Sequence, residues 1–262
     1  MLQLRSPATV LLLAALTALG PLATDMYLPA LPAIGQALGA DAGEVQLTLS
    51  LYMAGFALNQ LLCGPLSDRF GRKPVLLAGF TVFAAASVLC ALAQSIEVLL
   101  LGRFLQSFGG AVGPVLGRAA VRDIYAPQEA GRILAYMSSI MALAPAVAPI
   151  AGGLLLFQGW RAIFAVLAGW GIVMLALLAF ALPEPLPLDR RQSIRPAAIF
   201  ANFRQLLSDR LFIGYTLTSA SAFAGLFAFL SGSAFVLIDF FGVAPIEYGF
   251  YFAIGVGGFM LG

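Results

Sequence analysis

The feature of this sequence that most restricts its fold is a series of long apolar segments with few charges inside them. Seven span residues 8–35, 45–66, 75–94, 98–118, 133–157, 162–182 and 211–239, and an eighth begins near Glu247 and continues to residue 262. About 20 mainly apolar residues are enough to cross a membrane as a helix, which satisfies its own backbone hydrogen bonds there. We therefore predict an all-α integral membrane protein.

The composition supports a membrane location and excludes several other classes. Only 10% of the 262 residues are charged and 61% are hydrophobic, whereas soluble domains average about 25% and 45–50%. A net charge of +2, with no basic run interleaved with aromatic residues, argues against a nucleic-acid partner. Histidine is absent, which excludes imidazole metal sites and His-dependent triads. We predict no cofactor and no metal, and Cys63 and Cys90 lie too far apart for a disulfide.

The basic residues predict the orientation of the chain. Counting segments alternately, one side of the membrane receives 12 of the 14 Lys and Arg residues: Arg5, Arg69, Arg72, Lys73, Arg118, Arg122, Arg132, Arg190, Arg191, Arg195, Arg204 and Arg210. The opposite side has Arg161, and Arg103 lies inside a span. Because short cytoplasmic loops are enriched in Lys and Arg, we predict that the N-terminus is cytoplasmic.

We expect three parts along the chain. Residues 1–182 form a six-helix transmembrane bundle, and residues 183–210 form a cytoplasmic linker. Within the linker, the spacing of Ile199, Phe200, Phe203, Leu206 and Leu207 predicts an amphipathic helix lying on the membrane; a disordered linker is the alternative. Residues 211–262 begin a second bundle and stop within its second helix.

A weak internal repeat suggests the second bundle. A shift of 203 residues aligns five identities: Gly39, Glu44, Gly55, Phe56 and Leu58 over Gly242, Glu247, Gly258, Phe259 and Leu261. Parallel six-helix repeats are a transporter architecture, so we expect a fragment of a twelve-helix protein of roughly 390–400 residues. A protein of seven and a half spans is the alternative.

Charge is concentrated in the segment GPLSDRFGRKP, residues 64–74, between the second and third apolar segments. Two glycines and four charged residues define it: Gly64, Asp68, Arg69, Gly71, Arg72 and Lys73. This motif resembles the signature G-x-L-x-D-R-x-G-R-K that the major facilitator superfamily carries between its second and third helices. The resemblance implies that Asp68 engages the second half of the protein, beyond residue 262, and closes a cytoplasmic gate. Gly64 would allow close approach, and Gly71 a tight turn.

Further motifs in order strengthen the resemblance. The stretch LGRFLQSFGGA, residues 101–111, is similar to the R-x-x-Q-G motif of the fourth helix. The fifth-helix antiporter motif G-x-x-x-G-P-x-x-G-G is matched, with alanine for two glycines, at Pro145, Pro149, Gly152 and Gly153. The phrases TDMYLPALP and GRAAVRDIY resemble the Bcr/CflA group of twelve-helix drug:proton antiporters.

The resemblance implies a non-enzymatic, monomeric transporter of a bacterial inner membrane. Its partners would be a small-molecule substrate, protons and the lipid bilayer, with the proton gradient as the driving force. The expected function is export of small, moderately hydrophobic compounds by alternating access. A superfamily uptake symporter or a metabolite exporter is the alternative. A receptor or a membrane enzyme is disfavoured, because the chain has no catalytic cluster and no large soluble loop.

Two charged residues inside predicted spans are candidates for proton coupling. Asp25 lies in the first span and Arg103 in the fourth, at comparable depth in the outer half. A charged group is costly in a spanning helix and usually faces a polar cavity. We expect desolvation to favour the protonated form of Asp25, and Arg103 or a cationic substrate to favour its carboxylate. The alternative is that Asp25 forms a hydrogen bond near the outer interface.

The remaining candidates are less specific. The prolines and glycines of the antiporter motif permit bending and close helix contact. The resemblance places this segment between the two halves, where rocking occurs; a passively kinked helix is the alternative. Tyr27, Gln106 and Met141 are candidates for the substrate cavity, although a Tyr or Met in a spanning helix more often serves packing.

Overall fold

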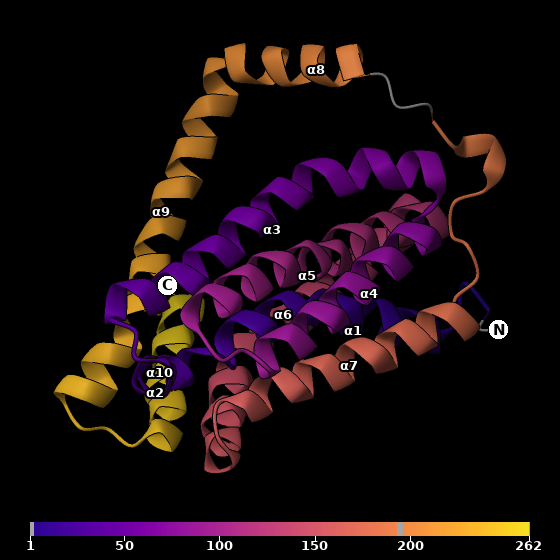
Figure 1. Cartoon of the computed structure of the whole chain (residues 1–262). Helices are drawn as coiled ribbons and strands as arrows, with labels where there is room; N and C mark the ends of the chain where they lie inside the picture. The colour runs from indigo at the N-terminus through magenta and orange to yellow at the C-terminus, as the bar shows by residue number, and fades with distance from the viewer. Residues whose placement is uncertain (1–2, 193–195, 262) are drawn as a thin grey trace.

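The computed structural model describes residues 3–192 and 196–261, and this part of the chain is helical and contains no strand (Figure 1). The α-helices are α1 (Pro7–Asp25), α2 (Leu31–Leu38), α3 (Ala42–Phe70), α4 (Arg72–Ala91), α5 (Ile96–Ile124), α6 (Pro127–Leu155), α7 (Arg161–Phe180), α8 (Pro196–Ser208), α9 (Arg210–Ala234) and α10 (Pro245–Leu261).

Within the described residues, seven helical stretches are long and apolar enough to cross a membrane, which confirms the predicted all-α membrane fold. A short 3-10 turn joins α1 to α2, so the two form a single candidate span, Pro7–Leu38. Helix α3 begins before the apolar segment predicted from the sequence, because Asp41 caps it in a reciprocal pair of hydrogen bonds with Glu44. Polar capping residues therefore extend α3 beyond its apolar segment.

The linker contains the helix α8, which Figure 1 shows extending away from the bundle before the chain turns into α9. Phe203, Leu206 and Leu207 of its predicted apolar stripe are exposed. The side chains of Ile199 and Phe200 lie outside the described residues. That α8 lies on a membrane surface stays a prediction.

Helix α5 lies at the centre of the first bundle, packed against α1, α3 and α4. These contacts are close because glycines allow the backbones to approach. A Cβ atom on Gly109 would overlap the backbone of Gly79 in α4, and one on Gly113 would overlap the carbonyl oxygen of Leu16 in α1. Helices in lipid gain little from hydrophobic burial against each other, so contacts of this kind supply much of their association.

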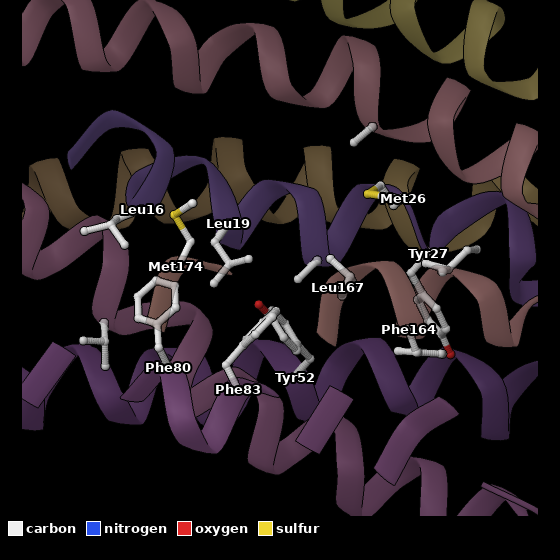
Figure 2. Close-up of a cluster of buried hydrophobic side chains, with 14 of the residues drawn as sticks. Leu16, Leu19, Met26, Tyr27, Tyr52, Phe80, Phe83, Phe164, Leu167 and Met174 are labelled. Carbon is white, nitrogen blue, oxygen red and sulfur yellow. The ribbon is translucent and has the colours of Figure 1, made fainter. Parts of the chain in front are cut away.

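Large side chains fill the remaining core between α1, α3 and α4. Figure 2 shows Tyr52, Phe80 and Phe83 pointing toward Leu16 and Leu19 of α1, and all five are fully buried. The close glycine contacts and this apolar cluster together fix the position of α1 relative to α5. The inward-facing polar residues of both helices are thereby held in place.

Helix α6 connects the first bundle to α10. A Cβ atom on Gly152 would overlap the carbonyl oxygen of Met26, and one on Gly153 would lie 2.6 Å from the carbonyl oxygen of Pro245. From the other side, Gly249 of α10 packs against the backbone of Ile150. Helix α6 therefore makes close backbone contacts with the end of α1 and with α10.

Replacement of Gly113 by alanine tests the close contact between α1 and α5. The added methyl group overlaps Leu16, and overpacking of this kind costs about 1–3 kcal/mol. We expect a lower thermal unfolding midpoint for the detergent-purified full-length protein.

Gly169→Ala is the matched control, because Gly169 lies within α7 with no heavy atom within 4 Å of an added Cβ. Helix propensity alone predicts a gain of up to about 1 kcal/mol for each variant. An unfolding midpoint for Gly113→Ala that equals that of Gly169→Ala would contradict the assigned contact.

Candidate functional site

A cavity of about 710 Å³ lies between α1, α3, α5, α6, α9 and α10. Its wall is mainly apolar and includes five phenylalanines: Phe56, Phe223, Phe227, Phe229 and Phe252. Thr24 and Gln60 are the uncharged polar side chains on the wall, and Asp25 and Arg118 are the charged ones. Cavities of about 300–1,000 Å³ with a few polar groups suit small organic molecules.

Proline residues shape the wall on three helices. Pro21 of α1, Pro114 of α5 and Pro145 of α6 are helix-interior prolines, and each lines the cavity. Proline removes a backbone donor and its ring displaces the preceding turn, so it bends a helix. Gly20 precedes Pro21, and a Cβ atom added to Gly20 would lie 3.6 Å from the side chain of Pro114. Prolines therefore weaken the regular helix where α1 and α5 meet the cavity.

Asp25 is the last residue of α1 and is only 5% exposed, yet its side chain lines the cavity. Among the described residues, no cation lies within 4.0 Å of its carboxyl group, and no side chain is hydrogen-bonded to it. Asp25 is thus a buried acid that faces the cavity without a counter-ion.

Arg103 is fully buried in an aromatic cage. Its guanidinium carbon lies 4.2 Å from the ring centroid of Tyr52, 4.5 Å from that of Tyr27 and 5.9 Å from that of Phe164. The faces of aromatic rings attract cations, most strongly where water is absent. The aromatic rings therefore contribute to stabilising the positive charge.

Hydrogen bonds fix one edge of the Arg103 guanidinium. Nη1 donates to the Ala23 carbonyl oxygen at 3.1 Å and to Oε1 of Gln106 at 2.6 Å, and Gln106 donates to Ser87 at 2.8 Å. Nε and Nη2 have no partner among the described residues. Because Ala23 is two residues before Asp25, the two charged side chains lie at similar depth but form no ion pair. Their coupling stays a prediction.

The structure places two of the three predicted cavity residues elsewhere. Met141 lines the cavity, whereas Tyr27 and Gln106 are fully buried outside it. The reason is that both belong to the Arg103 cage, where the Tyr27 hydroxyl bonds to Thr48 at 2.6 Å and Gln106 accepts from Arg103. In this conformation they position the cation.

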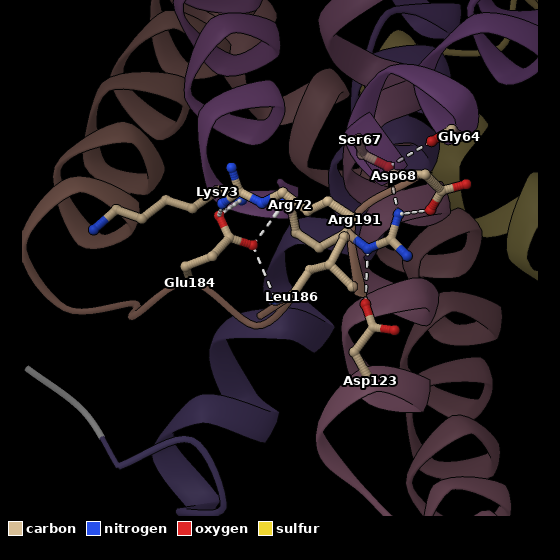
Figure 3. A network of polar contacts seen from close by, with 9 residues as sticks. All are labelled: Gly64, Ser67, Asp68, Arg72, Lys73, Asp123, Glu184, Leu186 and Arg191. Carbon is tan, nitrogen blue, oxygen red and sulfur yellow. Dashed lines mark hydrogen bonds and ion pairs between the residues drawn. The ribbon is translucent and has the colours of Figure 1, made fainter. Parts of the chain in front are cut away.

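The charged turn between α3 and α4 forms a polar network (Figure 3). Arg72 contacts the carboxylates of Asp68 at 2.6 Å and Asp123 at 2.7 Å, and it donates to Ser67 at 2.5 Å. Gly71 has a φ of 101°, a backbone conformation that favours glycine. The predicted tight turn at Gly71 is therefore present.

Two other predictions for this turn concern a close approach at Gly64 and the engagement of Asp68 with a second half of the protein. An added Cβ on Gly64 would meet no atom within 4 Å, so the expected close approach at Gly64 has no counterpart in the described part of the chain. The Asp68 side chain is 41% exposed and bonds Arg72, and its expected engagement with a second half of the protein stays a prediction. Arg69 lies over the Phe70 ring at 5.2 Å.

Glu184, in the segment that follows α7, caps the start of α4. Its carboxylate accepts from the backbone N–H groups of Arg72 at 2.8 Å and Lys73 at 3.1 Å. Lys73 in turn donates to the carbonyl oxygen of Ala179 in α7 at 2.8 Å. An acidic group at a helix N-terminus satisfies free N–H groups and interacts favourably with the helix dipole. This contact fastens the start of the linker to the charged turn.

Asp123 and Glu184 are site residues that the sequence did not identify as such. Asp123 belongs to the phrase GRAAVRDIY, and Glu184 is the second residue of the predicted linker. Their partners lie 51 and 112 residues away in the chain. No local pattern reveals contacts over that distance.

The antiporter motif lies along α6 as predicted. One of its residues lines the cavity, and its two glycines contact neighbouring helices. Pro145 lines the cavity, and Pro149 is buried one turn further along. Gly152 and Gly153 form the close contacts with α1 and with the start of α10 described above. The motif thus extends from the cavity to the contact with α10.

Comparison with known proteins assigns the family. The sequence profile described as Major Facilitator Superfamily matches residues 13–262. The chain belongs to the major facilitator superfamily. A bacterial homologue of the human lysosomal transporter Spinster, in an inward-facing, unoccupied conformation, has a similar fold, with a TM-score of 0.80 at 20% identity over 96% of this chain and 60% of that structure.

Sequence relatives include proteins named for drug resistance. An uncharacterised MFS-type transporter, YdgK of Bacillus subtilis, is 41% identical over 94% of this chain and 62% of its own length. A bicyclomycin resistance protein homolog of Haemophilus influenzae is 34% identical, covering 94% and 62%, and a chloramphenicol resistance protein of Pseudomonas aeruginosa is 38% identical, covering 94% and 58%. The chain thus spans about three fifths of the length of these relatives.

Replacement of Asp123 by asparagine tests the network at the charged turn. The side chain of Arg72 is only 9% exposed, so it would lose one of two carboxylate partners in a poorly hydrated place. Such losses cost about 1–3 kcal/mol. We expect a reduced thermal unfolding midpoint for the detergent-purified full-length protein.

Asp189→Asn is the control, because it removes the same charge from an exposed position in the linker. If both variants unfold at the same temperature, the ion pair between Arg72 and Asp123 contributes nothing measurable.

Proposed function

We propose that the full-length protein is a proton-coupled antiporter that exports small, moderately hydrophobic compounds across a bacterial inner membrane by alternating access. The observation that carries the proposal is a single buried carboxyl group, Asp25, on the wall of a mainly apolar cavity and without a counter-ion among the described residues. Relatives named for bicyclomycin, chloramphenicol and multidrug resistance support a drug-like substrate.

Exchange requires that a proton and a substrate weaken each other's binding. A protonated Asp25 is neutral and is compatible with an apolar cavity, whereas its carboxylate calls for a hydrogen-bond donor. A substrate that supplies such a group favours release of the proton, and rebinding of the proton favours release of the substrate. This coupling is reciprocal by thermodynamic necessity. The proton gradient then drives export without a cofactor.

Arg103 provides a second means of controlling the charge on Asp25. It lies at the same depth in α5, and its Nε and Nη2 atoms have no partner in the described part of the chain. In this conformation the aromatic cage holds the cation apart from the cavity. A rearrangement of the cage during transport would bring the guanidinium toward Asp25 and favour the carboxylate. We assign Arg103 this role in proton release.

The conformational change would take place at α6. Gly152 and Gly153 allow α6 to slide or rock against both α1 and α10, and Pro145 carries this motion to the cavity wall. The charged turn lies at the end of the bundle that carries most of the basic residues, which we place in the cytoplasm. There, Asp68 and the network around Arg72 would hold the gate closed in the outward-open state.

Replacement of Asp25 by asparagine is expected to abolish proton-driven transport while leaving membrane insertion intact. Asparagine has a similar shape but cannot exchange a proton. Chloramphenicol serves as the probe, and its accumulation is measured in respiring everted membrane vesicles that contain the full-length protein. We expect a loss to the level of vesicles without the transporter.

Glu97→Gln is the matched control, because Glu97 is an exposed carboxyl group that does not line the cavity. Proton-driven accumulation retained by Asp25→Asn would contradict the role of Asp25. Collapse of the proton gradient in intact cells separates export from uptake: cells with an exporter then accumulate more chloramphenicol, and cells with an uptake symporter accumulate less.

A further inference from the structure

Arg118 is a charged residue of the cavity to which the proposed exchange mechanism assigns no role. It lies on α5, lines the cavity and is exposed. Within residues 3–192 and 196–261, no acidic side chain lies within 4.0 Å of it. The acidic residue that follows it on α5, Asp123, is already paired with Arg72. The described part of the chain therefore leaves the Arg118 guanidinium without an acidic partner, and it can bind a ligand in the cavity.

Arg118 and Asp25 occupy different ends of the cavity. An added Cβ on Gly117 would lie 3.3 Å from the carbonyl oxygen of Leu13 and 3.5 Å from Thr17, so Arg118 is level with this part of α1. Asp25 follows 8 to 12 residues later on the same helix, which is about 12–18 Å at the rise of an α-helix. At that separation the two charges do not form an ion pair, and each acts on its own part of the cavity.

Phenylalanines occupy the wall of the same cavity on three helices. Phe56 comes from α3, Phe223 and Phe227 come from α9, and Phe252 comes from α10. Aromatic faces favour stacking with planar rings. A guanidinium forms paired hydrogen bonds with a planar anionic group such as a carboxylate. Together these features match a ligand with an aromatic body and an anionic group at one end.

We propose that Arg118 determines substrate charge, so that the cavity prefers planar aromatic compounds with an anionic group over lipophilic cations. The anionic group binds the Arg118 guanidinium, and the aromatic body contacts the phenylalanine wall. Like-charge repulsion from Arg118 weakens binding of a cation in the same cavity. This inference rests on the proposed function in one respect: it assumes that the cavity is the substrate site.

Binding of two probes with the same ring and opposite charge tests the proposal. The probes are 1-naphthaleneacetate and 1-naphthylmethylammonium, titrated calorimetrically into detergent-purified full-length protein at neutral pH. We expect the anion to bind at least about tenfold more tightly than the cation, as for a charge-assisted pair. Arg118→Gln should remove this preference, and Arg118→Lys should retain part of it because the charge remains.

Arg122→Gln is the matched control, since Arg122 lies one turn further along α5 and does not line the cavity. The proposal is overturned if the unmodified protein binds the anion no more tightly than the cation, a comparison that needs no variant to fold. It is also overturned if Arg118→Gln and Arg122→Gln have equal effects. Asp25→Asn should keep the preference for the anion, so failure of proton coupling and failure of this inference are distinguishable.

Discussion

The cost of placing a charged side chain inside a membrane protein governs the arrangement of the transmembrane region. Each such residue is stabilised in a different way. Arg72 is paired with two carboxylates, and Arg103 is enclosed by aromatic rings. Asp25 and Arg118 face the cavity without a counter-ion from the described part of the protein. The charges that the protein pairs internally stabilise its fold, and the proposed site contains the two that have no counter-ion among the described residues.

Close backbone contacts give the cavity its position. Glycines in α5 bring α1 and α4 against it, whereas Gly152 and Gly153 bring α6 against α1 and α10. The first set joins helices of one bundle and is supported by a fully buried apolar core (Figure 2). The second set joins that bundle to α10. Asp25 lies at the end of α1, close to where these two kinds of contact meet, which suits a residue that couples proton binding to movement of the halves.

The sequence predicted the membrane spans well, because a run of about 20 apolar residues is seldom found outside a membrane. It also singled out Asp25 and Arg103 as charged residues inside predicted spans, because charge along one helix can be read from the sequence, and their proposed roles stay predictions. It did not predict that Tyr27 and Gln106 surround Arg103 and lie outside the cavity. Nor did it reveal the partners of Arg72. Both failures have one cause: the face a residue presents, and the distant helix it meets, depend on packing between segments that a linear pattern does not encode.

The central claim is that a proton and a substrate compete through Asp25. Proton release on substrate binding measures this directly. Chloramphenicol is added to the detergent-purified full-length protein in weakly buffered solution, and protons are followed with a pH indicator. Reciprocal coupling predicts release approaching one proton per bound molecule, and none from Asp25→Asn protein that still binds. Binding without proton release by the unmodified protein, or equal release from the variant, would contradict the account.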